Sequence, residues 1–183
     1  AHSVPDAMGV VFETPEGIIV HSGDFKLDPT PIDAQPTDLA TFAGFGRRGV
    51  RLLLGDSTNA EVPGFVPSEA TIGGPLADIV AHADGRVILA CFASHIHRVQ
   101  QAVDAAVAGG RKVAFVGRSM LRNSAIATEL DLLSVPAELV VSLDELAKLP
   151  PDQIAVICNG SQGEPFAALS LMASGSHRSI TLE

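Results

Sequence analysis

Residues 86–117 read RVILACFASHIHRVQQAVDAAVAGGRKVAFVG, in which two short apolar runs flank a longer segment with helical spacing. The runs at 86–92 and 112–117 are rich in valine and other apolar residues, and they predict buried strands. The segment from His95 through Ala108 predicts a helix between them. A strand, a helix and a second strand in this order predict parallel neighbours in an α/β sheet.

The same alternation continues toward the C-terminus and extends the predicted sheet. It predicts a helix from about Ser119 to Leu133, a short strand at 139–141, a helical turn over LDELAKL, a strand at 153–159 and a helix over EPFAALSLMAS. Strands that alternate with helices of this length form parallel sheets with both faces covered. The predicted fold class is therefore α/β.

The N-terminal part of the chain has a different pattern. Short β-branched runs at 9–13 and 17–22 are separated by TPEG, which predicts a hairpin. The prolines of DPTPIDAQPTD then predict an ordered loop, and RLLLGDSTN supplies another apolar strand that ends in Gly-Asp. Because both HSGD and LLGD end in this way, we expect Asp24 and Asp56 at the carboxyl edges of two strands, where α/β proteins keep their chemistry.

Prolines and glycines in AEVPGFVPSEA, residues 60–70, separate these two patterns. Ser68 and the apolar residues that follow it at helical spacing predict that a helix begins here. We therefore predict a domain boundary, with one domain at 1–62 and a second at 63–183.

Composition and charge limit the kind of protein. The 183 residues are 46% hydrophobic and 18% charged, which predicts a globular protein with a sizeable core. A net charge of −9 excludes a surface that coats polyanions, since nonspecific nucleic-acid binding depends on clustered lysine and arginine. Any contact with nucleic acid must therefore be local.

The sequence also predicts a cytoplasmic protein without a membrane segment. No run approaches the roughly 18 consecutive apolar residues of a membrane span, and AHSVPDAMG lacks the basic and apolar regions of a signal peptide. Cys91 and Cys158 end apolar runs, which predicts buried thiols in a reducing compartment rather than a disulfide or a metal site.

Three predicted strand-to-helix junctions share small or hydroxyl residues and free backbone N–H groups, an arrangement that binds phosphate at a helix N-terminus. They are FASHIHR at 92–98, VGRSMLRN at 116–123 and CNGSQGEP at 158–165. In an open parallel sheet they lie on one edge and can line one crevice. The candidate phosphate-binding residues are Ser94, His95, His97, Arg98, Gly117, Arg118, Ser119, Ser161 and Gln162.

Each junction also has a purely structural interpretation, because serines cap helices and glycines serve tight turns. Three junctions on one edge favour ligand binding over that alternative. His95 and His97 lie two residues apart at a helix start, so their side chains point in different directions and do not predict a metal pair. We expect one of them to contact phosphate and the other to be solvated, and we expect His82 and His177 to be surface residues.

His2 and Asp24 are candidate metal ligands. Imidazole and carboxylate groups suit zinc or manganese, and Asp24 lies at a strand end where a metal site would need it. Two ligands do not complete a zinc site, so these residues alone predict only part of one.

The chain carries, in this order, AHSVPDAMGVVFETPEGIIVHSGDFKLD, RLLLGDSTN, ACFASHIHRVQQ, FVGRSM and NGSQGEP. Together these motifs resemble the ribonuclease J family, a bacterial group in the β-CASP branch of the metallo-β-lactamase superfamily. The resemblance runs from Ala1 to Glu183. It implies the C-terminal part of an αββα metallo-β-lactamase domain at 1–62, then a parallel-sheet, helix-covered β-CASP domain at 63–183 whose C-terminal end is missing.

The resemblance also implies an activity. The family consists of two-metal phosphodiesterases that act on RNA as endoribonucleases and as 5′-to-3′ exoribonucleases, in RNA maturation and decay. It implies two divalent ions, zinc in the first place and manganese as the alternative. It further implies RNA with a 5′-monophosphate as the preferred substrate, and a dimer or tetramer for the parent protein.

Individual residues match the family motifs. His2 resembles the third metal motif, and Asp24 resembles the fourth, a carboxylate that bridges both ions. Asp56 resembles the acidic residue of the first β-CASP motif, which orients histidine ligands, so Asp24 and Asp56 are the implied catalytic residues. The junctions at 94–95 and 117–119 fall where the family clamps RNA phosphates.

The family's HxHxDH cluster and its last histidine motifs are absent from the sequence, which starts at Ala1 rather than methionine. We therefore expect an internal fragment with little or no nuclease activity alone. Two alternatives stay open. One is a related β-CASP nuclease that acts on DNA or on other RNA ends, although ASHIHR and GSQGEP favour the bacterial RNA enzyme. The other is a noncatalytic α/β module that binds phosphate or a nucleotide.

Overall fold

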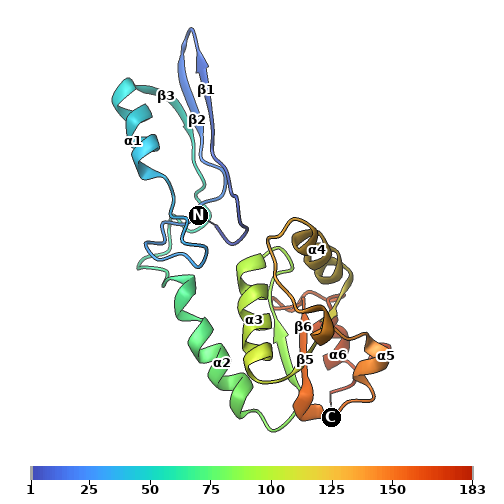
Figure 1. Cartoon of the computed structure of the whole chain (residues 1–183). Helices are drawn as coiled ribbons and strands as arrows, with labels where there is room; N and C mark the ends of the chain where they lie inside the picture. The colour runs from blue at the N-terminus through green and yellow to red at the C-terminus, as the bar shows by residue number, and fades with distance from the viewer. Residues whose placement is uncertain (1, 183) are drawn as a thin grey trace. The chain divides into compact units, whose positions relative to one another are not determined.

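The computed structural model describes residues 2–182 and divides into two compact units (Figure 1). The N-terminal unit comprises Ala1–Ala70 and the C-terminal unit comprises Thr71–Glu183. The sequence placed the boundary after residue 62, in the same stretch rich in proline and glycine. The division falls later because Asp28 of the N-terminal unit holds the end of that stretch, as described below.

The N-terminal unit contains a three-stranded sheet in the order β1-β2-β3. Strand β1 (Val10–Thr14) pairs antiparallel with β2 (Gly17–His21), which confirms the predicted hairpin across the TPEG turn. Strand β3 (Val50–Leu54) pairs parallel with β2. The parallel pairing requires a crossover, and helix α1 (Leu39–Arg48) provides it.

Helix α1 was not predicted, because its sequence LATFAGFGRR contains two glycines and little helical preference. Side-chain contacts, rather than helix propensity, stabilise this helix. Asp38 caps its N-terminus by accepting hydrogen bonds from the backbone N–H of Thr41 at 2.9 Å and from the Thr41 hydroxyl at 2.6 Å. At its other end the Arg48 guanidinium pairs with Glu13 of β1 and lies 5.4 Å from the centre of the Phe45 ring.

The C-terminal unit contains a parallel sheet in the order β4-β6-β5, with helices on both faces. The predicted α/β alternation is confirmed. Its elements are α2 (Gly73–His82), β4 (Val87–Ala90), α3 (Ile96–Ala108), β5 (Lys112–Val116), α4 (Arg118–Glu129), α5 (Leu143–Leu146), β6 (Ile154–Cys158) and α6 (Ala168–Ala173), with 3₁₀ turns at Ala137–Leu139 and Pro151–Gln153.

The central strand β6 divides the core of this unit into two clusters, because its side chains alternate between the faces of the sheet. Ala155 and Ile157 pack with residues of α2, α3 and α4. Ile154, Val156 and Cys158 pack on the other face with α5, α6 and Ile180. All five residues of β6 are buried, as expected for the middle strand of a doubly covered sheet.

Two local predictions differ from the structure. The strand expected at 139–141 is a 3₁₀ turn followed by a single bridge between Val140 and Val113. The last helix starts at Ala168 rather than at Glu164, because residues up to Ala167 form a turn in which Ala167 N–H donates to the Glu164 carbonyl at 3.0 Å.

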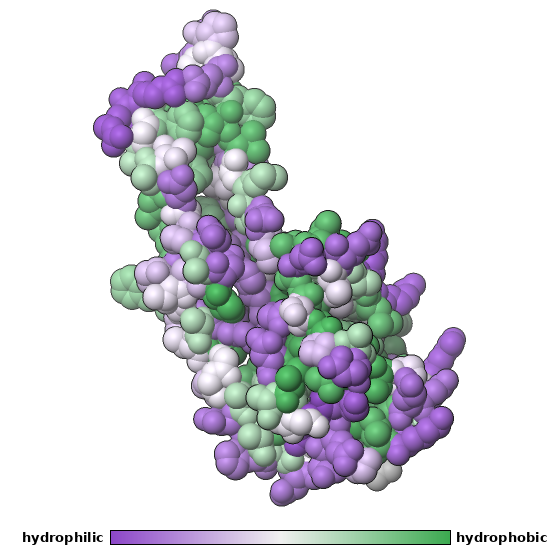
Figure 2. Space-filling view, in the orientation of Figure 1, coloured by the Kyte–Doolittle hydropathy of each residue, from purple (hydrophilic) through white to green (hydrophobic). Residues whose placement is uncertain are grey.

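The sheet of the N-terminal unit buries far less apolar surface. Ile18 and Val20 are its buried apolar residues among those the structure describes, whereas all five residues of β3 are exposed. Hydrophobic side chains accordingly show on the surface of this unit, over the sheet and α1 (Figure 2). Exposed apolar surface of this kind is typical of faces that contact other protein, membrane or ligand surfaces.

Two further expectations concern the cysteines and the membrane. Cys91 and Cys158 are buried, as predicted. Burial raises the pKa of the Cys158 thiol to about 12, with a smaller contribution from Cys91. Across residues 2–182, every helix is too short or too polar to span a bilayer.

Candidate functional site

The ends of β2 and β3 lie side by side and bring two acidic loops together. His21 pairs with Leu54, and the next residue, Ser22, donates its N–H to the Leu54 carbonyl at 3.0 Å. The Ser22 hydroxyl in turn accepts the backbone N–H of Asp56 at 2.9 Å. Asp24 and Asp56 therefore follow directly after adjacent parallel strand ends, where the Gly-Asp pattern placed them.

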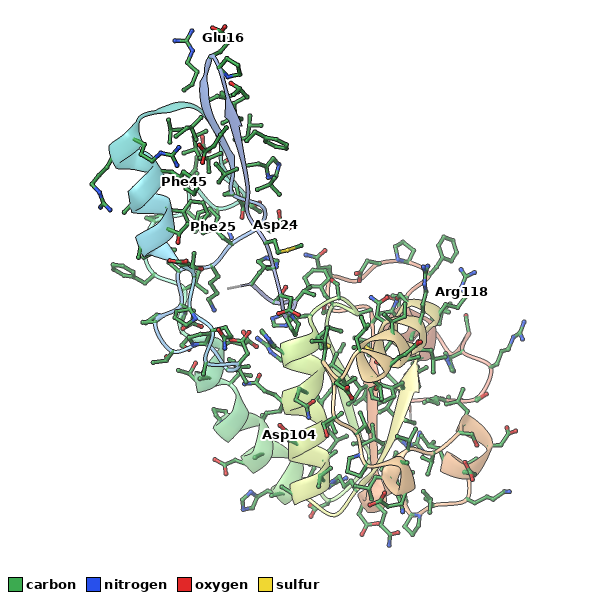
Figure 3. The ribbon with its side chains drawn as sticks, turned by 45° about the horizontal axis from the view of Figure 1, so that its top comes forward. Glu16, Asp24, Phe25, Phe45, Asp104 and Arg118 are labelled. Atoms are coloured by element: carbon green, nitrogen blue, oxygen red, sulfur yellow. The ribbon has the colours of Figure 1, made fainter. Side chains whose placement is uncertain are left out.

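Gly23 is required for the turn that leads to Asp24. Its φ of +63° lies in the left-handed region, and a Cβ here would come 2.4 Å from the backbone carbonyl oxygen of Met8. Asp24 follows at the end of β2 with an exposed side chain (Figure 3). Within residues 2–182 its carboxylate has no hydrogen-bond partner, which leaves both oxygens available for a ligand.

The carboxylate of Asp56 is held in place. It accepts hydrogen bonds from the Thr58 hydroxyl at 2.7 Å, from the Thr58 N–H at 3.0 Å and from the Phe25 N–H at 3.4 Å. The two bonds from Thr58 are the main cause that lowers the pKa of Asp56, and the charge of His2 lowers it further. Asp56 is therefore an ionised and oriented carboxylate that lies near His2 and next to Phe25.

His2 and Asp24 provide the donor types of a zinc or manganese site. The His2 ring is half-buried, and its Nδ1 lies 3.2 Å from the Ser3 hydroxyl. A zinc site needs at least three protein ligands. No cluster of three or more histidine, cysteine, aspartate or glutamate side chains with metal-binding geometry occurs within residues 2–182. The donor chemistry thus fits a metal, and a complete site would need further ligands.

Asp28, which the sequence did not single out, is a buried carboxylate in the same unit. Burial acts to raise its pKa, but hydrogen bonds from the N–H groups of Thr30 and Glu69 and from the Ser68 hydroxyl, each at 3.0 Å, together with Lys26, lower the pKa to about 2. Asp28 therefore fastens the loop after β2 to the segment that ends the N-terminal unit.

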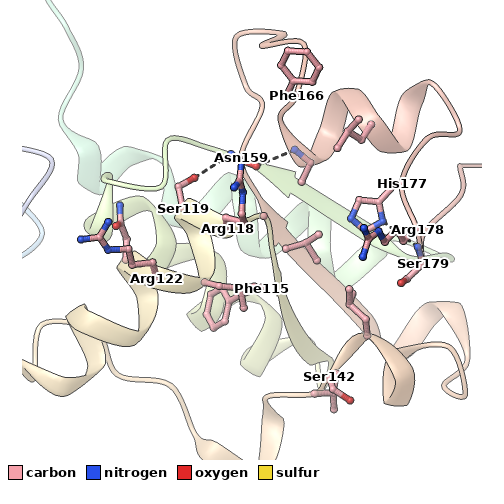
Figure 4. Close-up of a pocket in the computed structure, with 18 of the residues that line it drawn as sticks. Phe115, Arg118, Ser119, Arg122, Ser142, Asn159, Phe166, His177, Arg178 and Ser179 are labelled. Carbon is pink, nitrogen blue, oxygen red and sulfur yellow. Dashed lines mark hydrogen bonds between the residues drawn. The ribbon is translucent and has the colours of Figure 1, made fainter.

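A cleft of 1210 Å³ lies at the carboxyl ends of β5 and β6 in the C-terminal unit (Figure 4). The predicted residues Gly117, Arg118 and Ser119 line it. Gly117 has a φ of +105°, and a Cβ there would lie 2.4 Å from the side-chain oxygen of Asn159. Asn159 donates to the Ser119 hydroxyl at 3.1 Å and accepts the Ala168 N–H at 3.0 Å, so it ties the two junctions together.

Several residues that line this cleft were not predicted as site residues. Arg122 follows Arg118 by one helical turn, a spacing that could have identified it from the sequence. His177, which we expected to be a surface residue, is half-buried and lines the cleft, and its Nδ1 accepts the N–H groups of Ser179 and Ile180 at 3.3 and 3.2 Å. Other additions come from loops whose proximity depends on the fold, among them Asn159, Phe166 and Arg178.

The other predicted phosphate-binding residues do not line this cleft. In the junction after β4, Ser94 is exposed, and His95 caps α3 by accepting the Arg98 N–H at 3.1 Å. His97 is only 8% exposed, so it is not the solvated member of the pair, and His95 is half-buried. Ser161 and Gln162, after β6, are exposed.

A family model described as "Ribonuclease J, beta-CASP domain" matches residues 84–183. Among curated proteins, the chain is 51% identical to ribonuclease J of Corynebacterium glutamicum over 181 residues, which is 99% of the chain and 25% of that protein. It is 49% identical to ribonuclease J of Thermus thermophilus and 43% identical to that of Helicobacter pylori, each over 182 residues, the whole chain, and covers 32% and 26% of those proteins. The chain thus spans about a quarter to a third of the length of these relatives.

Proposed function

The chain belongs to the ribonuclease J β-CASP family, and on that premise we propose that it is the central part of a metal-dependent ribonuclease that hydrolyses phosphodiester bonds in RNA. The observation that carries the chemistry is the pair of acidic loops after β2 and β3. They place an unpartnered carboxylate, Asp24, beside an oriented one, Asp56.

The residues have distinct roles in this proposal. Asp24 and His2 hold divalent metal ions, with zinc as the first candidate and manganese as the alternative. Asp56 positions the metal-binding side chains, which suits a carboxylate that the hydrogen bonds from Thr58 already fix and that lies near His2. The ions, when bound, neutralise the negative charge that develops on the phosphate during hydrolysis.

The two units have different roles in this proposal. The N-terminal unit is part of a metallo-β-lactamase domain and contributes to the metal site. The C-terminal unit is the β-CASP domain, and its junctions after β4, β5 and β6 bind RNA phosphates through Ser94, His95, Gly117 to Ser119 and Ser161. The preferred substrate in this proposal is RNA with a 5′-monophosphate, which the enzyme cleaves both exonucleolytically and endonucleolytically. The intact protein is a dimer or tetramer in the cytoplasm.

The chain by itself is inactive in this proposal. His2 and Asp24 provide only two ligands, and a metal centre that cleaves phosphodiesters needs more. Metal-dependent RNA cleavage by the isolated chain of 183 residues would contradict this part of the proposal.

The test of the metal role is Asp24→Asn in the full-length protein. We expect at least about a 100-fold loss of RNA cleavage together with loss of bound metal, because the amide removes a charged ligand. Asp33→Asn is the matched control, since Asp33 lies in the loop of the same unit and accepts the Gln35 N–H through an oxygen that asparagine keeps. Metal content by mass spectrometry and RNA cleavage are measured on the same samples.

Retained cleavage in Asp24→Asn would remove Asp24 from the mechanism. A metal-free wild-type protein that binds nucleotides without cleaving RNA would instead favour the noncatalytic alternative. Asp56→Asn provides an intermediate case, with a loss of about 10- to 100-fold expected because it acts through other ligands.

A further inference from the structure

One hydroxyl group joins the two acidic loops of the N-terminal unit. The Ser22 side chain donates to the Gly23 carbonyl at 2.7 Å and accepts the Asp56 N–H at 2.9 Å. The Gly23 carbonyl belongs to the peptide bond that leads to Asp24. A single oxygen atom therefore holds the backbone just before Asp24 and the backbone of Asp56.

The turn before Asp24 is fixed on both sides of Gly23. The Gly23 N–H donates to Nδ1 of His21 at 3.0 Å, while its carbonyl accepts the Ser22 hydroxyl. Its φ of +63° sets the direction of the chain, and the space where a side chain would begin is taken by the Met8 carbonyl oxygen. The position of the Asp24 backbone therefore depends on the hydrogen bonds from His21 and Ser22.

The second loop is joined to the first through the same residue. Ser22 donates its own N–H to the Leu54 carbonyl at 3.0 Å, at the end of β3. Its hydroxyl then accepts the Asp56 N–H, and a longer bond of 3.4 Å runs from the Phe25 N–H to the Asp56 carboxylate. Ser22 thus bonds to the loop after β3 through both its backbone and its side chain.

A hydroxyl at a strand end can also have a purely structural role. Thr14, at the turn between β1 and β2, shows that role with the same two types of bond. Its hydroxyl donates to the Gly17 carbonyl at 2.7 Å and accepts the Glu16 N–H at 3.2 Å, so both partners lie in its own turn. Ser22 differs because its hydroxyl accepts an N–H 34 residues away, from a loop with another candidate catalytic residue.

We propose that Ser22 is a positioning residue whose hydroxyl sets the spacing between Asp24 and Asp56, and thereby the affinity of the site for divalent metal. The inference rests on the proposed ribonuclease function and extends it to a residue that binds neither metal nor RNA. Removal of a group that orients metal ligands costs about 10- to 100-fold in metal affinity or activity. A displacement of about 1 Å at a catalytic group can cost about 100-fold in rate.

The test is Ser22→Ala in the full-length protein. Zinc affinity is measured by competition with a chromophoric chelator, and kcat and KM are measured on single-stranded RNA with a 5′-monophosphate at saturating metal. We expect zinc affinity to fall by about 10- to 100-fold and kcat by about tenfold or more, because the two loops are no longer held at one spacing. KM for RNA should change less than twofold, since Ser22 does not contact the substrate.

Ser22→Thr and Thr14→Ala are the matched variants. Threonine keeps the hydroxyl at position 22, so zinc affinity and kcat should stay within about threefold of the wild type. Thr14→Ala removes an equivalent pair of hydrogen bonds at the opposite end of β2. It should lower the melting temperature about as much as Ser22→Ala does, while zinc affinity and kcat stay unchanged.

Three results would overturn the inference. They are a zinc affinity in Ser22→Ala within twofold of the wild type, an equal loss of affinity in Ser22→Thr, and a melting temperature for Ser22→Ala far below that of Thr14→Ala. The last result would make the hydroxyl a general structural requirement.

Failure of this inference is distinguishable from failure of the proposed function. If Asp24→Asn loses metal and RNA cleavage while Ser22→Ala matches the wild type, only the role of Ser22 is refuted. A full-length wild-type protein that binds no metal would instead refute the proposed function.

Discussion

The sheets of the two units in this chain differ in how far they are buried. In the C-terminal unit, helices cover both faces of β4-β6-β5, and every residue of β6 is buried. In the N-terminal unit, β3 is exposed along its whole length. Each unit nevertheless contains a buried charge. Asp28 is held by N–H and hydroxyl donors, and Arg111 donates to the backbone carbonyls of Val80, Gly85 and Ile154 at 2.7 to 3.3 Å.

The two units differ in the interactions that hold their candidate functional residues in place. The C-terminal unit buries apolar residues on both faces of its sheet, and its cleft lies at the carboxyl ends of β5 and β6. The N-terminal unit holds its acidic loops mainly by hydrogen bonds, from the Asp56 N–H to the Ser22 hydroxyl and from the Ser68 hydroxyl and the Glu69 N–H to the Asp28 carboxylate. Its apolar strands are suited to packing against additional protein.

The largest expected effect is on the core of the C-terminal unit. Leu146 of α5 is 1% exposed and Leu53 of β3 is 63% exposed, so the same change at both sites compares the core of the C-terminal unit with the exposed strand of the N-terminal unit. Leu146→Ala should lower the free energy of unfolding by about 2–5 kcal/mol, and Leu53→Ala in the 183-residue chain by less than about 0.5 kcal/mol. Urea denaturation followed by circular dichroism measures both.

Equal losses in the free energy of unfolding would contradict the comparison, because they would mean that β3 is covered in solution. The same Leu53→Ala substitution in the full-length protein extends the test. A larger loss there than in the isolated chain would indicate that other parts of the protein pack on β3.

The second prediction concerns acid sensitivity of the N-terminal unit. The pKa of Asp28 in the folded state, about 2, is below its ordinary value of 3.8, so its contribution is present above about pH 4 and is lost as the pH falls toward 2. That contribution amounts to about 2 kcal/mol. Asp28→Asn should remove this part of the pH dependence, measured by the unfolding midpoint of the unit between pH 2 and pH 6.

Asp84→Asn, at an exposed carboxylate of the C-terminal unit, is the control. It should leave the acid profile unchanged. If Asp28→Asn retained the full profile of the wild type, the hydrogen bonds from Thr30, Ser68 and Glu69 would not be the cause.

The smallest effect is on thiol reactivity, which reports opening of the C-terminal unit. Cys158 packs with Leu146, and burial keeps its thiol protonated. Labelling by a thiol reagent at neutral pH should therefore be slow, accelerated severalfold by Leu146→Ala and unchanged by Asp28→Asn. Acceleration by Asp28→Asn would mean that the two units open together.

The sequence predicted most strands because apolar runs bounded by glycine and aspartate have few other interpretations. It missed α1 because LATFAGFGRR has weak propensity, and the stabilising partners, Glu13 and Asp38, include one 35 residues from Arg48. It also predicted a strand at 139–141 where only Val140 bridges to Val113, because apolar character alone does not fix pairing.

The candidate site could be predicted only in part. The Gly-Asp endings placed Asp24 and Asp56 at strand ends, and the parallel register of β2 and β3 then explains why they are neighbours. The residues that line the cleft were harder to predict from the sequence. Arg178 and Phe166 reach it from segments far in sequence from α4, and sequence spacing does not reveal such long-range proximity. The metal-binding and RNA-binding roles stay predictions.

The most direct test of the central claim is anomalous X-ray diffraction from crystals of the full-length protein, recorded at the zinc and manganese absorption edges. We predict a metal peak within about 2.0–2.2 Å of a carboxylate oxygen of Asp24, with His2 as a second ligand. A fully occupied metal site elsewhere, with Asp24 in solvent or in an ordinary ion pair, would contradict the account.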